Sequence, residues 1–276
     1  MPGYDLHSHS TYSDGLLAPA VLVQRAAARG VEVLALTDHD DTGGLAEAAA
    51  AARETSLTLV PGAELSVSWE RHTIHVVALQ IDPHNQVLGE GLAEIRSGRD
   101  ARARRMANSL ADVGIPGAYE GARRFVTSER LISRSHFARF LIEQGHAKDM
   151  KSVFRRYLTQ GKPGYVAHAW ATLPQAVGWI HAAGGQAVLA HPGRYRVTAT
   201  GMRRLLGGFR EAGGDGIEVL SSSHTPAQFT EYATYARVFG LLGSTGSDYH
   251  GPGESWMDLG ALPPLPAGVT PVWARW

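Results

Sequence analysis

The 276-residue sequence contains no cysteine. This excludes disulfide bonds, thiolate zinc sites and a cysteine nucleophile, so any bound metal must be held by histidine and carboxylate groups. The sequence also lacks a run of 18 apolar residues, and its first residues contain neither a basic segment nor an apolar core. We therefore expect no membrane span, no signal peptide and a cytoplasmic location.

Net charge is absent as well, because 26 basic residues balance 26 acidic ones. This argues against a generically cationic nucleic-acid binder and against an acidic disordered chain. The balance conceals two parts of opposite charge: residues 94–162 contain 15 Lys and Arg against 7 Asp and Glu, and the rest has 11 against 19. Lysine is scarce, with 3 residues against 23 arginines. Arginine pairs bidentately with phosphate, but codon bias would produce the same excess.

Short apolar segments alternate with longer alanine-rich segments, which is typical of strands and helices around a largely parallel sheet. Expected strands cover residues 4–7, 31–36, 57–60, 73–81, 186–190, 216–219 and 241–243. Most of them run directly into His, Asp, Glu or Ser, and in a parallel barrel these ends share one face. Expected barrel helices cover residues 18–29, 44–54, 173–183, 202–212 and 227–238.

The stretch from residue 86 to residue 164 breaks this rhythm with helical windows at 92–113, 135–144 and 149–158. It coincides closely with the basic segment. We predict that residues 86–164 form an inserted helical subdomain, whereas residues 1–85 and 165–276 form the barrel.

A His-x-His pair stands at the first strand end, where His7 and His9 would point to one side. Alone this pair is a weak signal, but the other expected strand ends supply further ligand types. These are Asp14, His39, Glu64, His75, His191, Asp248 and His250. Imidazole and carboxylate without thiolate suit Mn²⁺, Zn²⁺ or Fe²⁺. Nine ligands exceed the needs of one ion, so we expect two to three divalent ions, an arrangement that suits phosphate ester hydrolysis.

Three aspartates surround His39 in the sequence. We expect Asp38 to support the ligands or to handle a proton. Asp40 and Asp41 are expected to cap the helix that follows.

In chain order these motifs resemble those of the PHP (polymerase and histidinol phosphatase) family. They are His7-Ser8-His9, Ser13-Asp14-Gly15, Thr37-Asp38-His39-Asp40, Gly62-Ala63-Glu64, His75, Ala190-His191-Pro192 and Gly246-Ser247-Asp248-Tyr249-His250. The resemblance spans residues 5–250. It implies a distorted seven-stranded β/α barrel, a trinuclear metal centre that often holds manganese, and a metal-ligand role for all nine residues. It also implies that the helical insertion covers the active site.

The insertion contains a candidate phosphate site. Ser135 is the expected N-cap of a helix whose free N–H groups would face an anion, with Arg134 and His136 beside it. An ordinary capped helix with a solvated arginine would look the same in sequence. Arg99, Arg102 and Arg105 recur every three residues and are candidates for one substrate-binding helix face, although such runs are usually solvated.

Two segments, Tyr157–Val166 and Gly184–Pro192, resemble one PHP branch. That branch contains stand-alone phosphatases that remove the 3′-phosphate of nucleoside 3′,5′-bisphosphates, and related 5′-3′ exoribonucleases that act on short RNA. One departure is Ser135, where the branch usually has proline.

We therefore expect a metal-dependent phosphoesterase with Mn²⁺ preferred over Zn²⁺ or Fe²⁺. One substrate phosphate would lie over the metals and a second would contact Arg134, Ser135 and His136. The residues expected to handle the leaving-group proton are Asp38, His191 and Asp248. The expected partner is a nucleotide or a short RNA, with no membrane and no obligate protein partner. A histidinol-phosphate-type phosphatase, a nuclease acting only on RNA 5′-ends and a non-catalytic PHP regulatory module remain alternatives.

Overall fold

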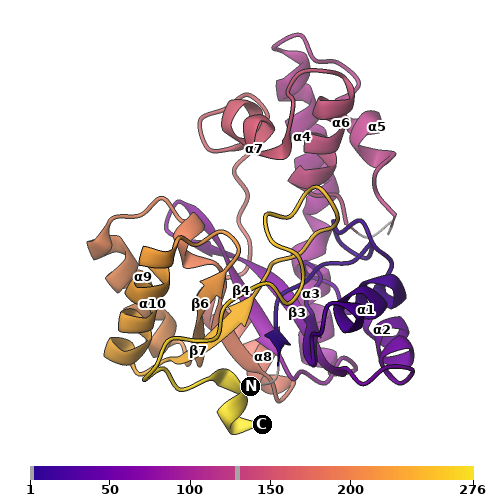
Figure 1. The fold of residues 1–276 in the computed structure, drawn as a ribbon. Helices are drawn as coiled ribbons and strands as arrows, with labels where there is room; N and C mark the ends of the chain where they lie inside the picture. Colours follow the sequence, from indigo (N-terminus) through magenta and orange to yellow (C-terminus); the bar gives the residue numbers. More distant parts are fainter. Residues whose placement is uncertain (1–2, 128–130) are drawn as a thin grey trace.

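Seven strands form one curved sheet in the computed structural model, which describes residues 3–127 and 131–276 (Figure 1). In sheet order they are β1 (Tyr4–Asp5), β2 (Val33–Leu36), β3 (Thr58–Trp69), β4 (His72–Leu79), β5 (Gln186–Leu189), β6 (Gly216–Ser221) and β7 (Leu242–Gly246). All neighbours are parallel except that β4 runs antiparallel to β3 and β5. The backbone N–H of Leu6 donates to Thr245 O at 2.9 Å, which joins the two ends of the sheet. The expected seven-stranded α/β barrel is confirmed.

Strand β3 continues far beyond residue 60, where the sequence indicated its end. Pro61 pairs with Leu36 of β2, and Gly62 pairs with Leu79 of β4, so the chain changes partners at this dipeptide. Proline is tolerated where a strand needs no ladder donor. Glycine fits because a Cβ at Gly62 would lie 2.7 Å from the Ala78 carbonyl oxygen. The resulting long hairpin brings Glu64 and His75 to the same end of the barrel as the parallel strand ends.

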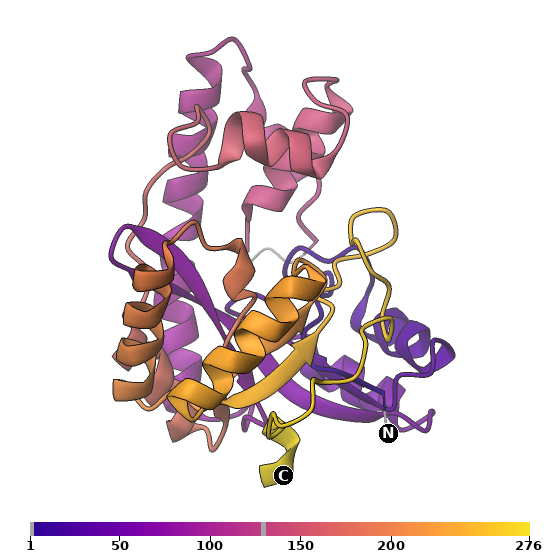
Figure 2. The same cartoon turned by 60° about the vertical axis from the view of Figure 1, so that its left-hand side comes forward.

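In the described part of the chain, six helices surround the barrel, and their apolar faces form the main core with the outer face of the sheet (Figure 2). They are α1 (Pro19–Ala28), α2 (Leu45–Ala52), α3 (Gln86–Ser97), α8 (Leu173–Ala182), α9 (Ala199–Glu211) and α10 (Pro226–Phe239). A smaller cluster that includes Leu6, Val188 and Val272 fills the barrel interior. Short 3₁₀ helices cover Pro192–Arg194 and Val272–Arg275. Among the described residues, no helix is long and apolar enough to cross a membrane.

The other helices form a layer above one end of the barrel in both views (Figures 1 and 2). They are α4 (Arg99–Ala111), α5 (Ala118–Arg123), α6 (Arg134–Glu143) and α7 (Met150–Val153), which continues as a π-helix over Phe154–Leu158. This layer has its own hydrophobic core, built from α4 to the π-helix. Its basic residues therefore belong to a separately packed unit.

Helix α3 packs with the barrel, although the sequence rhythm placed the insertion boundary at residue 86. Leu88, Leu92 and Ile95 are buried in the main core. The window expected at residues 92–113 is divided at Gly98, where a Cβ would lie 2.3 Å from the His168 ring. The second hydrophobic core includes Ala103 of α4 and extends to the π-helix, so the separate packing of the layer starts after this break.

Candidate metal centre

Nine His, Asp and Glu side chains gather at the barrel end beneath the helical layer. Their ligand atoms form three groups, each within 4.8 Å: His9, Asp14, His39 and His250; His7, His9, Glu64 and Asp248; and His39, Glu64 and His75. Shared members join the groups into one cluster. The ninth residue, His191, places Nε2 at 2.8 Å from Glu64 Oε1. The structure thus brings together every residue expected to bind metal.

Glu64 lies at the centre of the cluster and is fully buried. Its two carboxylate oxygens lie 2.8–3.3 Å from ring nitrogens of His7, His9, His39, His75 and His191. Burial alone would raise the pKa of Glu64, but the adjacent imidazoles of His39, His75 and His7 hold it well below its usual range. The lowered pKa favours the ionised carboxylate, which could serve as a ligand for divalent cations.

The donor set fits divalent metal ions. Asp14 Oδ1 and Glu64 Oε2 are buried and accept no hydrogen bond from any residue that the structure describes. Such groups are costly unless a cation or donor satisfies them. His7 Nε2 and His9 Nε2 face each other at 3.2 Å, and a shared cation would satisfy both nitrogens. Imidazole and carboxylate ligands are typical of Mn²⁺, Fe²⁺ and Zn²⁺.

Strained backbone turns direct several of these side chains. His191, two residues after β5, has φ 25°, and Asp248, two residues after β7, has φ 54°. Non-glycine residues rarely adopt positive φ, and such strain, about 1–3 kcal/mol each, concentrates at functional sites. The backbone is therefore strained at two of the clustered residues, just beyond the ends of β5 and β7.

A cavity of about 120 Å³ opens beside the cluster, between the barrel and the helical layer. Four arginines line it: Arg99, Arg102, Arg134 and Arg194. Burial, with Arg134 and Arg99 nearby, lowers the pKa of Arg102 to about 9. Arg99 pairs with Asp40 and Arg194 pairs with Asp248, whereas Arg102 and Arg134 form no ion pair with a carboxylate that the structure describes. A bound anion would therefore stabilise Arg102 and Arg134 in this poorly solvated space.

Two of the three arginines spaced along α4 face this cavity. Arg99 contacts Asp40, and the Arg102 Nε donates to Val166 O at 3.1 Å. Arg105 is exposed and lies outside the cavity, so the prediction of a single arginine face is wrong for it. A three-residue step falls about 60° short of a full helical turn, and two steps carry Arg105 around the helix.

The start of α6 differs from the prediction by two residues. Ser133, not Ser135, is the N-cap: its Oγ accepts the Ser135 N–H at 3.0 Å, and His136 Nδ1 accepts the Ser133 N–H at 3.0 Å. The prediction was wrong because the helix begins at Arg134. Burial lowers the pKa of His136 to about 4, which suits this acceptor role.

Arg134 and Ser135 line the cavity as expected, whereas His136 does not. Ser133 lines it too, and its Oγ also donates to Asp14 Oδ2 at 2.9 Å, which connects the helical layer to the cluster.

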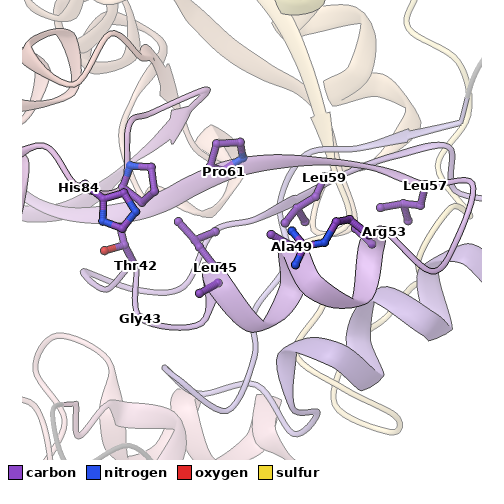
Figure 3. A pocket seen from close by; sticks show the side chains of 12 residues that line it. Thr42, Gly43, Leu45, Ala49, Arg53, Leu57, Leu59, Pro61 and His84 are labelled. Carbon is purple, nitrogen blue, oxygen red and sulfur yellow. The ribbon is translucent and has the colours of Figure 1, made fainter.

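A larger groove of about 750 Å³ lies elsewhere, between α2 and the first half of β3 (Figure 3). Leu45, Ala49 and Leu59 make most of its exposed lining apolar, and Arg53 stands at its side. Strands β3 and β4 are joined by a hairpin, so their connection contributes no helix to cover this part of the sheet. None of the clustered ligands lines this groove, whereas Asp14, His39, His75 and His250 line the smaller cavity.

Comparison with known proteins identifies the family. A family model described as PHP domain matches residues 5–163. The chain belongs to the PHP domain family. It is 53% identical to the 3′,5′-nucleoside bisphosphate phosphatase of Chromobacterium violaceum, over 99% of this chain and 96% of that protein. It is 46% identical to the 5′-3′ exoribonuclease Rnm of Escherichia coli, over 99% of this chain and 93% of that protein.

Solved structures agree with this PHP assignment. A Chromobacterium violaceum amidohydrolase, solved with bound sulfate and no metal, superposes with a TM-score of 0.96 at 52% identity, covering 99% of this chain and 95% of that one. A metal-dependent phosphoesterase from Bifidobacterium adolescentis superposes with a TM-score of 0.83 at 28% identity, covering 99% and 94%. The resemblance noted in the sequence is thereby confirmed.

The PHP centre includes one supporting carboxylate that sequence reasoning missed. Glu218 of β6 is buried, and its Oε1 lies 2.6 Å from His7 Nδ1, while its Oε2 accepts the His191 N–H. A carboxylate that accepts from one ring nitrogen directs the other nitrogen toward a metal. The available signal was an ionisable residue within the apolar strand Gly216–Ser221.

Replacing Glu218 with glutamine is expected to weaken metal binding by roughly 10–100-fold, because His7 loses the acceptor that orients it. Titration calorimetry with Mn²⁺ on the metal-free protein measures this change. Glu211→Gln, at the exposed end of α9, is the matched control. Equal affinities for the Glu218 variant and wild type would contradict the orienting role.

Asp38 supports a loop of the PHP site from outside the cavity. Its carboxylate accepts from the Ser10 N–H at 2.8 Å, from Ser10 Oγ at 2.6 Å and from Ser13 Oγ at 2.5 Å. Ser13 Oγ in turn lies 3.3 Å from His9 Nδ1. These contacts hold the loop that carries His9 and Asp14.

Asp40 and Asp41 do not cap α2, so that prediction is wrong. The N-cap position is Gly44, and Asp41 Oδ1 accepts the Gly43 N–H at 2.7 Å. The Asp41 carboxylate therefore binds the turn that precedes α2 and not the first turn of α2 itself. Asp40 instead accepts the Ser66 N–H at 2.7 Å and pairs with Arg99, which anchors α4 to the barrel.

Proposed function

We propose that this PHP protein hydrolyses the 3′-phosphate of nucleoside 3′,5′-bisphosphates, giving nucleoside 5′-monophosphate and phosphate. One observation carries the proposal: a metal-ligand cluster lies directly beside a cavity lined by four arginines. A substrate with two phosphates matches this pair of features, because one phosphate can face the cluster while the other meets the cationic wall. The name of the Chromobacterium violaceum relative points to the same reaction.

The nine clustered side chains would hold two to three divalent ions, for which we propose Mn²⁺. When bound, such ions stabilise charge on the phosphoryl oxygens and activate water. The ligand chemistry supports this choice, as does the resemblance to a family in which manganese is common.

The helical layer would hold the 5′-phosphate. Arg134 and Ser135 face the cavity at the start of α6, and Arg102 reaches it from α4. The guanidinium groups donate charge-assisted hydrogen bonds to phosphate, and the positive end of the α6 dipole favours the same anion. Ser133 and Asp14 connect this anchor to the cluster, so the two phosphates are held at a defined separation.

Hydrolysis breaks the bond between phosphorus and the 3′-oxygen, water supplies the new oxygen on phosphorus, and the 3′-oxygen takes a proton. We assign that proton to His191, Asp248 or Asp38. His191 and Asp248 lie in the cluster, where the leaving oxygen would be. Asp38 accepts three hydrogen bonds and does not line the cavity.

Short 5′-phosphorylated RNA contains the same kind of bond between a 3′-oxygen and phosphorus. Its first 3′-oxygen is esterified to a phosphate that continues into the second nucleotide. Breaking that bond releases a nucleoside 5′-monophosphate and leaves a new 5′-phosphate on the shortened chain. We therefore include 5′-3′ exoribonuclease activity in the proposal, in line with the name of the Escherichia coli relative.

A phosphate-release screen tests the function. With Mn²⁺, adenosine 3′,5′-bisphosphate should react much faster than adenosine 3′-phosphate, adenosine 5′-phosphate or histidinol phosphate, and a chelator should stop the reaction. Preference for histidinol phosphate would replace the proposal with that phosphatase activity. Fewer than one bound ion per chain together with no chelator-sensitive hydrolysis would identify a non-catalytic module.

A further inference from the structure

A basic surface extends from the cavity along α7 and the π-helix. Residues 148–162, here called the α7 segment, have five exposed basic side chains: Lys148, Lys151, Arg155, Arg156 and Lys162. None of the five forms an ion pair with a carboxylate of residues 3–127 or 131–276. The single acidic residue, Asp149, caps α7 by accepting the Ser152 N–H. This surface therefore offers uncompensated positive charge to a polyanion.

An exposed indole stands beside this surface. Trp256 is 78% exposed, the largest exposed fraction among the large hydrophobic residues that the structure describes. It belongs to the segment after β7, which rises from the barrel toward the helical layer in both views (Figures 1 and 2). The Lys151 ammonium lies 5.2 Å from its ring centroid. An aromatic face next to basic side chains is the usual composition of a site for single-stranded nucleic acid.

The position of this pair relates it to the proposed active site. Ser255, the residue before Trp256, accepts the backbone N–H of His250 at 2.7 Å, and His250 belongs to the ligand cluster. On the other side, Phe154 lines the cavity one turn after Lys151. Both elements thus lead directly out of the catalytic cavity.

Arg139 holds the chain segment that carries Trp256 against the helical layer. Arg139 of α6 donates to Glu254 at 2.8 Å through both Nε and Nη2, and its Nη2 also donates to Asp14 O. Because Glu254 and Ser255 are both anchored, the neighbouring Trp256 is presented at the rim of the site by a held backbone. Holding an aromatic ring in place lowers the entropy cost of stacking on it.

We propose that Trp256 and the α7 segment bind the RNA nucleotides that follow the scissile phosphate. The indole stacks on a base, and Lys151 and Arg155 contact backbone phosphates. This inference rests on the proposed function, because an exonuclease must accommodate a chain leaving the phosphate held at the cluster. A nucleoside bisphosphate has no such chain and does not use this surface. Loss of Trp256 should therefore weaken binding of the RNA much more than binding of the nucleoside bisphosphate.

Fluorescence polarisation in chelator tests the site without hydrolysis. The probe is a 5′-phosphorylated pentauridylate with a 3′-fluorescein. Trp256→Ala is expected to raise its Kd about tenfold, the effect of losing one stacked base. Trp256→Phe should retain most of the affinity. Val238→Ala, which removes a 71%-exposed apolar side chain from α10, is the matched control and should bind as wild type does.

Kinetics with Mn²⁺ provides the second measurement. Trp256→Ala should raise KM for the unlabelled RNA about tenfold, with a much smaller effect on hydrolysis of adenosine 3′,5′-bisphosphate. Equal Kd values for Trp256→Ala and wild type would overturn the proposal. So would an equal loss on both substrates, which would indicate that Trp256 only supports the loop of His250, or a change in sedimentation, which would place it between two copies of the chain. If wild type hydrolyses neither substrate, the proposed function fails, while polarisation still decides whether RNA binds at Trp256.

Discussion

Replacing Glu64 with glutamine is expected to lower kcat/KM for adenosine 3′,5′-bisphosphate by roughly a thousandfold or more. The carboxylate lies beside five imidazoles, those of His7, His9, His39, His75 and His191. Glutamine keeps the size of the side chain but removes the negative charge, so divalent ions held by the cluster would lose an anionic ligand. Phosphate release at saturating Mn²⁺ measures the loss.

The control for this variant is Glu70→Gln, an exposed residue of the β3–β4 hairpin. It changes the same functional group on the same hairpin and should leave kcat/KM unchanged. Bound metal is measured on both variants by elemental analysis, and circular dichroism checks that both are folded. A folded Glu64→Gln variant with more than a tenth of wild-type activity would show that this carboxylate is not central to the reaction.

Replacing Arg134 with methionine is expected to slow hydrolysis of the bisphosphate much more than hydrolysis of the 3′-monophosphate. We expect kcat/KM for adenosine 3′,5′-bisphosphate to fall about 100-fold, the typical effect of removing one partner of a charge-assisted phosphate contact. Adenosine 3′-phosphate lacks the anchoring phosphate, so its slower hydrolysis should change little. Initial rates for both substrates, measured on wild type and variant, give the comparison directly.

Arg105→Met is the matched control, because Arg105 is an arginine of the same helical layer whose side chain lies outside the cavity. It should leave both rates unchanged. Two results would contradict an anchoring role for Arg134: an equal loss on both substrates, or a wild-type enzyme that hydrolyses the monophosphate as efficiently as the bisphosphate.

The gathering of the candidate ligands at one end of the barrel was predictable from the sequence because most of them follow strand ends. In an alternating strand and helix pattern, parallel strand ends meet at one face, so a ligand that follows a strand has a known position. This reasoning places His7, His191 and Asp248 correctly without any knowledge of packing. It also succeeded for His75, because the hairpin partner of a parallel strand returns to the same end of the barrel.

The site residues that the sequence did not reveal are those whose partners come from distant parts of the chain. Glu218 supports His7 across 211 residues, and no periodicity connects the two. Ser133 donates to Asp14 across 119 residues, and this contact depends on how the helical layer sits on the barrel. The cap position of α6 and the division of α3 from α4 were missed for a different reason: element ends are determined by individual hydrogen bonds and close contacts.

By itself, the sequence determined the fold class, the end of the barrel where the candidate ligands gather, and the ligand types, since these follow from periodicity and composition. Only the tertiary structure decided which arginines face the cavity, which carboxylates support the ligands, and that Trp256 stands beside Lys151. The absence of cysteine had already limited the possible metal ligands to histidine and carboxylate groups. Their arrangement required packing, because side chains far apart in the sequence meet only when the barrel closes and the helical layer docks on it.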